Sequence, residues 1–234
     1  MITLRKSAER GHANHGWLDS YHSFSFNRYH DPAHMQYSVL RVINEDVIAP
    51  AAGFGMHPHR DMEIITYMLS GELRHTDDIG NSAVIRAGDV QRMSAGTGVM
   101  HSEVNASASA PVHLLQIWLL PERKGITPGY EDMHFPRAGK LNRWRLIASR
   151  EHRPDSLLVH QDVALHATVL EPGRHLDYEL DAARSAYLQV ARGEIELNGV
   201  RLLAGDAAKL DLPQRLTLTA VTEAELLLFD LPAA

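Results

Sequence analysis

The sequence of 234 residues contains no cysteine. Disulfides and thiolate ligands are therefore excluded, and any bound metal must be held by His, Asp, Glu or backbone oxygen atoms. Long apolar segments are also missing. Residues 1–16 hold no apolar stretch of the signal-peptide kind, and no later run approaches the roughly 20 apolar residues that a membrane-spanning helix needs. We therefore expect a cytoplasmic protein with no membrane partner.

Basic residues are outnumbered and scattered. The 23 Lys and Arg residues stand against 29 Asp and Glu residues, so the formal net charge is -6, and no long Lys/Arg block is present. A protein that grips a phosphate backbone needs a clustered positive surface, so direct nucleic-acid binding is not expected. With 44% hydrophobic residues, the chain can fold as one large all-β domain or as two small ones with a substantial core.

Helical periodicity is scarce, whereas short apolar runs bounded by Gly, Pro, Asn and Asp recur along the chain. Runs of this kind predict an all-β sandwich or barrel. The clearest ones cover residues 37–43, 64–69, 112–118, 164–170, 186–190 and 225–229.

An internal repeat emerges when the glycines are used as reference points. Met68-Leu-Ser-Gly71-Glu-Leu and Ile85-Arg-Ala-Gly88-Asp-Val are echoed by Val190-Ala-Arg-Gly193-Glu-Ile and Leu202-Leu-Ala-Gly205-Asp-Ala. Glycine at each position suits a turn that needs a positive φ angle. The repeat predicts two similar β-domains, which we place at residues 1–140 and 141–234. The linker is expected within the Gly-, Pro- and charge-rich residues 121–154.

Histidine is abundant, and His57-Pro58-His59 is the one His-x-His triplet. Random placement of fifteen histidines in this chain would produce about one such triplet, so the spacing by itself says little. On a strand, however, side chains two residues apart point to the same face, and two imidazoles can converge on one ion. Pro58 has no N–H group and suits a strand end or edge.

A second pair with the same spacing, His101 and Glu103, follows the glycine-rich residues 94–98. A second strand could bring this imidazole and carboxylate to the same point. Two chelating pairs are much less probable by chance than one. From the spacing alone, two interpretations remain: a metal site, or surface histidines at polar strand ends.

Four stretches together resemble the pirin family of the cupin superfamily. They are GHANHGWLDSYHSFSFNRYHDP (residues 11–32), HPHRDMEIITYMLSGELRHTDDIGN (57–81), MSAGTGVMHSE (93–103) and LLQIWLLPERKGITPGYE (114–131). The resemblance implies an all-β bicupin of two antiparallel, jelly-roll-like barrels. Residues 1–140 would form the metal-binding barrel with its N-terminal arm, and residues 141–234 a degenerate barrel without metal.

The resemblance also implies the ligands His57, His59, His101 and Glu103 for one divalent transition metal. It favours Fe(II), whereas the ligand types by themselves also suit Zn, Mn, Co, Ni or Cu. In cupins generally, the glutamate that follows His-x-His is often a ligand, which would nominate Glu63. The His-Ser-Glu sequence fits the pirin variant instead, so we interpret Glu63 as a supporting or structural residue.

In function, the chain looks like pirin-type quercetin 2,3-dioxygenases, which open a flavonol-like substrate with O2. Glu103 would be the catalytic residue and accept the proton of the substrate 3-hydroxyl group. One alternative is a non-catalytic metal-dependent redox sensor or transcriptional co-regulator that acts through a protein partner, although the sequence offers no partner motif. Another is a closed, structural zinc site.

The remaining histidines are expected to be structural or solvated. We expect the residues around His12, His15 and His22 to be an arm that packs on a barrel and could also wall the pocket. Phe54, Met56, Met93 and Met100 are either barrel core or an apolar substrate wall. The histidines expected to be structural or solvated include His75, His113, His134, His152, His160 and His166.

Overall fold

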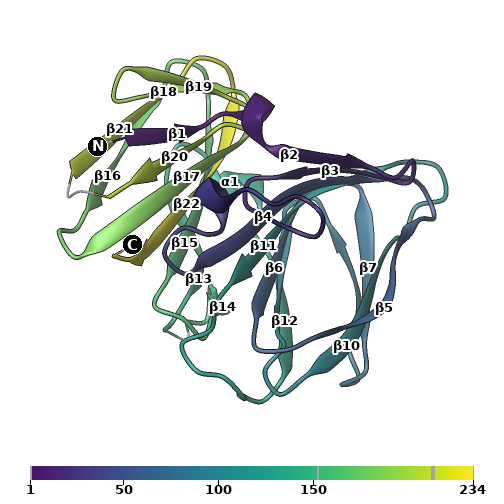
Figure 1. The fold of residues 1–234 in the computed structure, drawn as a ribbon. Helices are drawn as coiled ribbons and strands as arrows, with labels where there is room; N and C mark the ends of the chain where they lie inside the picture. Colours follow the sequence, from purple (N-terminus) through teal and green to yellow (C-terminus); the bar gives the residue numbers. More distant parts are fainter. Residues whose placement is uncertain (1, 152, 212–213, 234) are drawn as a thin grey trace.

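The computed structural model describes residues 2–151, 153–211 and 214–233, and nearly all of its regular structure is β-strand (Figure 1). Four sheets form two barrels, each made of one seven-stranded and one four-stranded sheet. Strand pairing is antiparallel, except between β13 and β14. The all-β, two-barrel fold predicted from the sequence is confirmed. Among the described residues, no helix is long and apolar enough to cross a membrane.

The N-terminal barrel contains the two predicted chelating pairs. In spatial order, its larger sheet comprises β12 (Gly129–His134), β9 (Asp89–Ser94), β6 (Glu63–Ser70), β11 (Val112–Leu119), β4 (Leu40–Ile48), β3 (Leu18–His22) and β2 (Gly11–Asn14). Its smaller sheet comprises β5 (Gly53–His59), β10 (Val99–Asn105), β7 (Glu72–Asp77) and β8 (Ser82–Arg86).

The C-terminal barrel repeats this plan around an interior filled by leucine, isoleucine, valine and alanine side chains. Its larger sheet comprises β1 (Ile2–Arg5), β20 (Ala207–Leu210), β17 (Arg184–Arg192), β22 (Ala224–Pro232), β15 (Ala164–Leu170), β13 (Arg145–Ser149) and β14 (Leu157–Leu158). Its smaller sheet comprises β16 (His175–Leu180), β21 (Gln214–Ala220), β18 (Glu194–Leu197) and β19 (Val200–Leu203). The short helices are η1 (Ser7–Glu9), η2 (Pro32–His34) and α1 (Arg137–Lys140).

The glycine repeat marks equivalent turns in the two barrels. Gly71 joins β6 to β7 as Gly193 joins β17 to β18, and Gly88 joins β8 to β9 as Gly205 joins β19 to β20. All four glycines have φ between +77° and +91°. The predicted positive φ angles are therefore confirmed, and L side chains would be strained at these positions.

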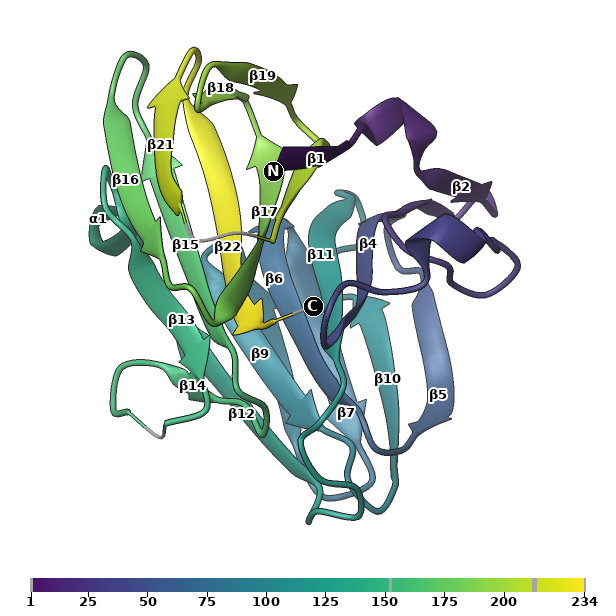
Figure 2. The ribbon, with the colours of Figure 1, turned by 60° about the vertical axis from the view of Figure 1, so that its left-hand side comes forward.

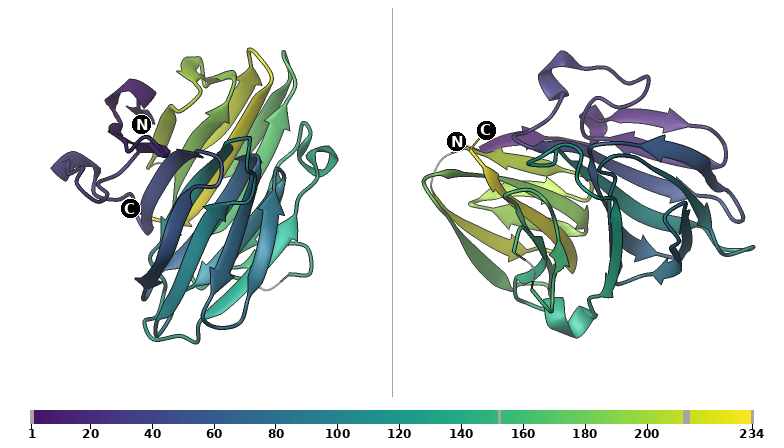
Figure 3. Two further views of the ribbon diagram at one scale, coloured as in Figure 1. Left: turned by 90° about the vertical axis from the view of Figure 1, so that its right-hand side faces the viewer. Right: turned by 90° about the horizontal axis from the view of Figure 1, so that it is seen from below.

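The two barrels share one hydrophobic core, because their seven-stranded sheets pack face to face (Figures 2 and 3). Strand β6 explains how the sequence permits this packing. Ile65, Tyr67 and Leu69 point toward the other barrel, while Ile64 and Met68 point into their own. A strand covered on both faces reads as a continuous apolar run rather than an alternating one.

Polar side chains also connect the barrels, and two of these connections involve buried charged residues, Lys140 and Glu63. The Nζ atom of Lys140 lies 2.7 Å from the Tyr67 hydroxyl and 3.0 Å from Oε1 of Glu225. At the second connection, Oε2 of Glu63 accepts hydrogen bonds from the Ser94 hydroxyl at 3.0 Å and the His160 backbone N–H at 3.1 Å.

The N-terminal segment crosses from one barrel to the other. Strand β1 pairs with β20 of the C-terminal barrel, with Ile2 opposite Leu210, and in Figure 1 it lies beside the green and yellow strands. The main crossing comes between β12, which pairs with β9, and β13, which pairs with β15. The boundary at residue 140 falls between these strands and stays a prediction.

Candidate metal centre

Both chelating pairs lie on strands of the four-stranded sheet of the N-terminal barrel. His57 and His59 are on β5, which is an edge strand and so tolerates Pro58 between them. His101 and Glu103 are on the neighbouring β10, where both side chains are buried. In the β5–β10 ladder His101 lies directly opposite His57, and the register then shifts between His101 and Glu103.

The three imidazoles form a compact cluster. The ring centroids of His57 and His101 are 4.5 Å apart, and His59 lies 4.8 Å from each of them. One ligand nitrogen from each ring lies within 4.8 Å of the others. Burial, reinforced by the neighbouring histidines, lowers the pKa of His59 to about 4 and that of His101 to about 2. His59 and His101 can therefore offer neutral nitrogen lone pairs, which is the form that binds a metal.

The hydrogen bonds of these rings fit a metal ion. The Nδ1 atom of His57 lies 2.7 Å from the carbonyl oxygen of Gly55 and must donate to it, which leaves the Nε2 lone pair available. His101 is 1% exposed, and neither of its ring nitrogens has a hydrogen-bond partner among the described residues. Buried polar atoms normally have partners. A metal ion at the cluster would supply one.

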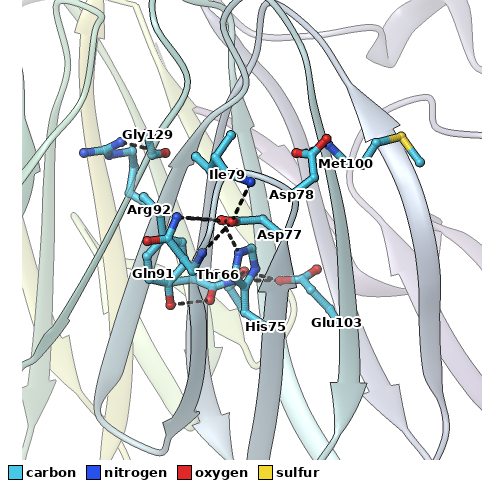
Figure 4. Close-up of polar contacts among 12 residues, drawn as sticks. Thr66, His75, Asp77, Asp78, Ile79, Gln91, Arg92, Met100, Glu103 and Gly129 are labelled. Atoms are coloured by element: carbon cyan, nitrogen blue, oxygen red, sulfur yellow. Dashed lines mark hydrogen bonds and ion pairs between the residues drawn. The ribbon is translucent and has the colours of Figure 1, made fainter.

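Glu103 is held by three donors beside this cluster, and Figure 4 shows two of them, Thr66 and Gln91, near its carboxylate. Its Oε1 atom accepts from Gln91 Nε2 at 2.6 Å and shares the proton of Thr66 Oγ1, at 3.1 Å, with Gln116 Oε1 at 2.8 Å. Its Oε2 atom accepts from Gln116 Nε2 at 2.7 Å. Each carboxylate oxygen has about two lone pairs, so Oε2 retains one for a metal ion or a proton. Burial raises the pKa of Glu103, although His75 and the hydrogen bonds from Thr66 and Gln116 oppose the increase.

The carboxylate of Glu103 groups with His75 and His101 rather than with all three clustered imidazoles. Ligand atoms of His75, His101 and Glu103 lie within 4.8 Å of one another, and all three side chains are buried. The structure thus brings the four predicted ligands to one end of the barrel in two overlapping groups that share His101.

His75 is a site residue that sequence reasoning missed, since we expected it to be structural or solvated. Its Nε2 atom lies 3.1 Å from Oδ2 of Asp77, and its Nδ1 atom is buried without a partner among the described residues. Its ring stacks on Tyr130 at 4.5 Å. Figure 4 shows His75 between Asp77 and Glu103. The available sequence signal was the His-x-Asp spacing on one strand face, which is weak on its own.

A row of polar side chains crosses the larger sheet opposite the cluster. The ladder places His22 opposite Asn44, Asn44 opposite Gln116, Gln116 opposite Thr66, and Thr66 opposite Gln91. On both sides of this row the inward positions of β6 and β11 are apolar, as Met68 and Leu114 are on one side. The last three residues of the row, Gln116, Thr66 and Gln91, supply all three donors to Glu103, so this end of the row is specialised around that carboxylate.

A cavity of about 610 Å³ opens at the cluster. Aromatic side chains form much of its wall. Trp17 and Phe54 are in edge contact at 5.2 Å, and Trp118 is in edge contact with His59 at 5.0 Å. The N-terminal arm contributes residues from Ala13 to Asn27 and so walls the cavity. The lining comprises Ala13, His15, Trp17, Leu18, Ser20, His22, Phe26, Asn27, Asn44, Asp46, Phe54, His57, His59, Glu103, Gln116 and Trp118.

The remaining candidates lie elsewhere. Glu63 belongs to neither ligand group. Its carboxylate accepts hydrogen bonds from Ser94 of its own barrel and from the backbone N–H of His160, on the side of the second barrel. Of the residues that could be core or substrate wall, Phe54 lines the cavity, Met93 is buried core and Met56 is exposed. His152 lies outside the described residues.

Comparison with known proteins agrees with this architecture. A family model described as Pirin matches residues 3–119, and one described as Quercetinase C-terminal cupin domain matches residues 146–231. The chain is 48% identical over 233 residues to a protein of Escherichia coli (strain K12) named quercetin 2,3-dioxygenase, with 99% of both sequences covered. It is 41% identical over 231 residues to a pirin-like protein of Caulobacter vibrioides, with 98% of this chain and 99% of that protein covered.

Solved structures give the same assignment. The chain matches the crystal structure of bacterial pirin YhhW from Escherichia coli in complex with nickel(II), with a TM-score of 0.95, 46% identity and complete coverage of both chains. The family-model matches, the whole-length identity and the shared two-barrel fold show that this chain belongs to the pirin family.

Proposed function

We propose that this chain is a metal-dependent dioxygenase that opens a flavonol-like substrate with O2, with iron(II) as the ion. The observation that carries the proposal is the cluster of three imidazoles at a cavity with aromatic walls. The relatives named quercetin 2,3-dioxygenase support the reaction class, and 48% identity over 99% of the chain supports its transfer to this protein. The ligands in this proposal are His57, His59, His101 and Glu103.

The protein would contribute binding, orientation and a dry environment. When bound, the metal supplies Lewis acidity that lowers the pKa of a coordinated hydroxyl group, together with a redox-active centre for O2. Trp17, Phe54 and Trp118 offer flat apolar surfaces for an aromatic ring system. Three imidazoles and one carboxylate leave room in an octahedral shell, whereas a tetrahedral ion would be closed.

Glu103 would accept the proton of the substrate 3-hydroxyl group on Oε2. Thr66, Gln91 and Gln116 hold the carboxylate in place, and its remaining lone pair is free to receive the proton. Burial raises the pKa of this carboxyl, which strengthens it as a base. A carboxylate bound tightly to the ion is a poor base, so the proposal requires that Glu103 loosens during the reaction.

The test begins with metal-free protein, loaded anaerobically with Fe, Mn, Co, Ni or Cu in separate samples. Quercetin and then air are added, and flavonol absorbance is followed. We expect loss of the absorbance with loaded protein, fastest with iron, and no loss with apo-protein or with the loaded His101→Ala variant. Unchanged absorbance with every metal would exclude quercetin as a substrate.

The same preparations separate the alternatives that the sequence left open. A redox sensor would show no turnover, and would gain or lose a protein partner when its iron is oxidised. A structural zinc site would instead give apo-protein that unfolds, and a bound ion without an open coordination position.

A further inference from the structure

We propose that Asp46 and Ser20 form a second recognition site in the cavity, which binds a hydroxyl group on a phenolic substrate at a point remote from its metal-bound oxygen atoms. This inference rests on the proposed function and adds a specificity determinant to it. It concerns the larger sheet, whereas His57, His59, His101 and Glu103 all belong to the smaller one.

The two residues form a cross-strand pair on the cavity wall. Ser20 on β3 lies directly opposite Asp46 on β4, and the Ser20 hydroxyl donates to Oδ1 of Asp46 at 2.5 Å. Both side chains line the cavity, and the residues are only 2% and 4% exposed. On β4, Asp46 lies two residues from Asn44, and so the two side chains point to the same face of the strand. Asp46 therefore lies beside the polar row that runs from His22 to Gln91.

The hydrogen bonding of Asp46 is incomplete. Among the described residues, its one hydrogen-bond donor is Ser20, on Oδ1, and Oδ2 has none. Glu103, the other buried carboxyl in the cavity, has three donors. His22 and Asn44, the adjacent pair, bond to each other at 2.8 Å. A buried carboxyl with one neutral donor is costly to maintain, and a ligand that donates to Oδ2 would offset part of that cost.

The electrostatic environment agrees with this role. Burial raises the pKa of Asp46 to about 7, and the nearby Glu103 and Glu45 carboxyls add to the increase. Near neutral pH the group can therefore accept a hydrogen bond as a carboxylate or donate one as an acid. No arginine or lysine donates a hydrogen bond to this carboxyl among the described residues, so an ion pair does not explain its burial.

The surrounding surface selects the kind of ligand. Trp17, Phe26 and Phe54 line the same cavity, and their faces and edges suit a flat aromatic ring. A cationic ligand would be repelled by a metal ion bound at the three imidazoles. A neutral phenolic hydroxyl group fits both constraints, because it can donate to the carboxyl while its ring packs on the aromatic wall.

The experiment compares quercetin with 3-hydroxyflavone, which keeps the 3-hydroxyl group but lacks the hydroxyl groups remote from it. Dissociation constants are measured anaerobically with metal-loaded protein, and kcat/KM in air. The variants are Asp46→Leu, which keeps the number and branching of side-chain heavy atoms, Ser20→Ala, and the conservative Asp46→Asn. Asp19→Asn is the matched control, because it removes a carboxylate from the position next to Ser20 on β3, where the side chain pairs with His12 and does not line the cavity.

We expect Asp46→Leu to weaken quercetin binding about tenfold, and to leave 3-hydroxyflavone binding and metal content unchanged. Asp46→Asn should recover part of the loss, and Asp19→Asn should resemble the wild type. Equal losses for both flavonols, or none for quercetin, would overturn the proposal, as would wild-type protein that binds neither compound. Hydroxyl-dependent binding without turnover in air would support this site and defeat the dioxygenase proposal.

Discussion

At the scale of single residues, the chemistry of the centre is set by what surrounds each side chain. His101 and Glu103 are both buried, yet burial has opposite effects on their titration, because it disfavours the charged form of each. It lowers the pKa of His101 and raises that of Glu103. The result is a set of neutral nitrogens beside a carboxyl that depends on hydrogen bonds from Thr66, Gln91 and Gln116.

The donors to Glu103 provide a test at this scale. Gln91→Leu removes the 2.6 Å hydrogen bond to Oε1, so the carboxylate loses part of its orientation. Outer partners of metal ligands typically change affinity about 10- to 100-fold, and we expect a decrease in that range from metal titration of the apo-protein. Gln189→Leu, which changes a buried glutamine of the C-terminal barrel, is the matched control. Equal affinities in the two variants would show that Gln91 does not support the site.

At the scale of elements, the geometry depends on how closely β5 and β10 approach each other. A Cβ atom on Gly53 would lie 2.3 Å from the carbonyl oxygen of Glu103 and 2.5 Å from Cα of Val104. Such contacts are impossible without movement of the backbone. Gly53 therefore permits the approach at the point where the ladder shifts register beside Glu103.

Two glycines on the same strand make this argument testable. Gly53→Ala should separate β5 from β10, lower the free energy of unfolding by about 1–3 kcal/mol and weaken metal binding. In Gly55→Ala the new methyl group meets nothing within 4 Å, so we expect a change within about 0.5 kcal/mol. Urea unfolding and metal titration of both variants provide the measurement, and equal behaviour of the pair would contradict the close-approach explanation.

At the scale of the whole molecule, the two barrels behave as one body in packing terms. They share a core, the N-terminal strand β1 completes the larger sheet of the C-terminal barrel, and the buried Lys140 pairs with Glu225. A buried ammonium group that loses its carboxylate partner is left uncompensated, and this is costly even where the intact pair contributes little.

Substitutions of Glu225 and Glu223 compare the loss of a buried ion pair between the barrels with the loss of an exposed one. Glu225→Leu should lower the free energy of unfolding by about 3 kcal/mol, because Lys140 stays buried without its partner. Glu223→Leu breaks an exposed pair with Arg137 and should cost less than about 1 kcal/mol. Denaturant unfolding at neutral pH measures both. Similar small losses would indicate that Lys140 escapes to solvent when its partner is removed.

Much of this organisation was predictable from local patterns. The i, i+2 spacing placed His57 with His59 and His101 with Glu103 on shared strand faces, and the glycine repeat predicted two barrels with matching turns. Neither pattern carries information about which strands are neighbours. His75 and the row from His22 to Gln91 were missed for that reason, since the row exists only when five strands are aligned in register.

The sequence by itself determined the all-β class, the duplication, the family and the residue types able to hold a metal, because these follow from periodicity, glycine positions and motif order. Only the tertiary structure decided the environment of each group. It surrounded Glu103 with three donors, directed Glu63 toward the second barrel, and left Asp46 buried with a single partner. Burial and hydrogen bonding arise from contacts between residues distant in sequence, and those contacts are fixed by strand register and sheet packing.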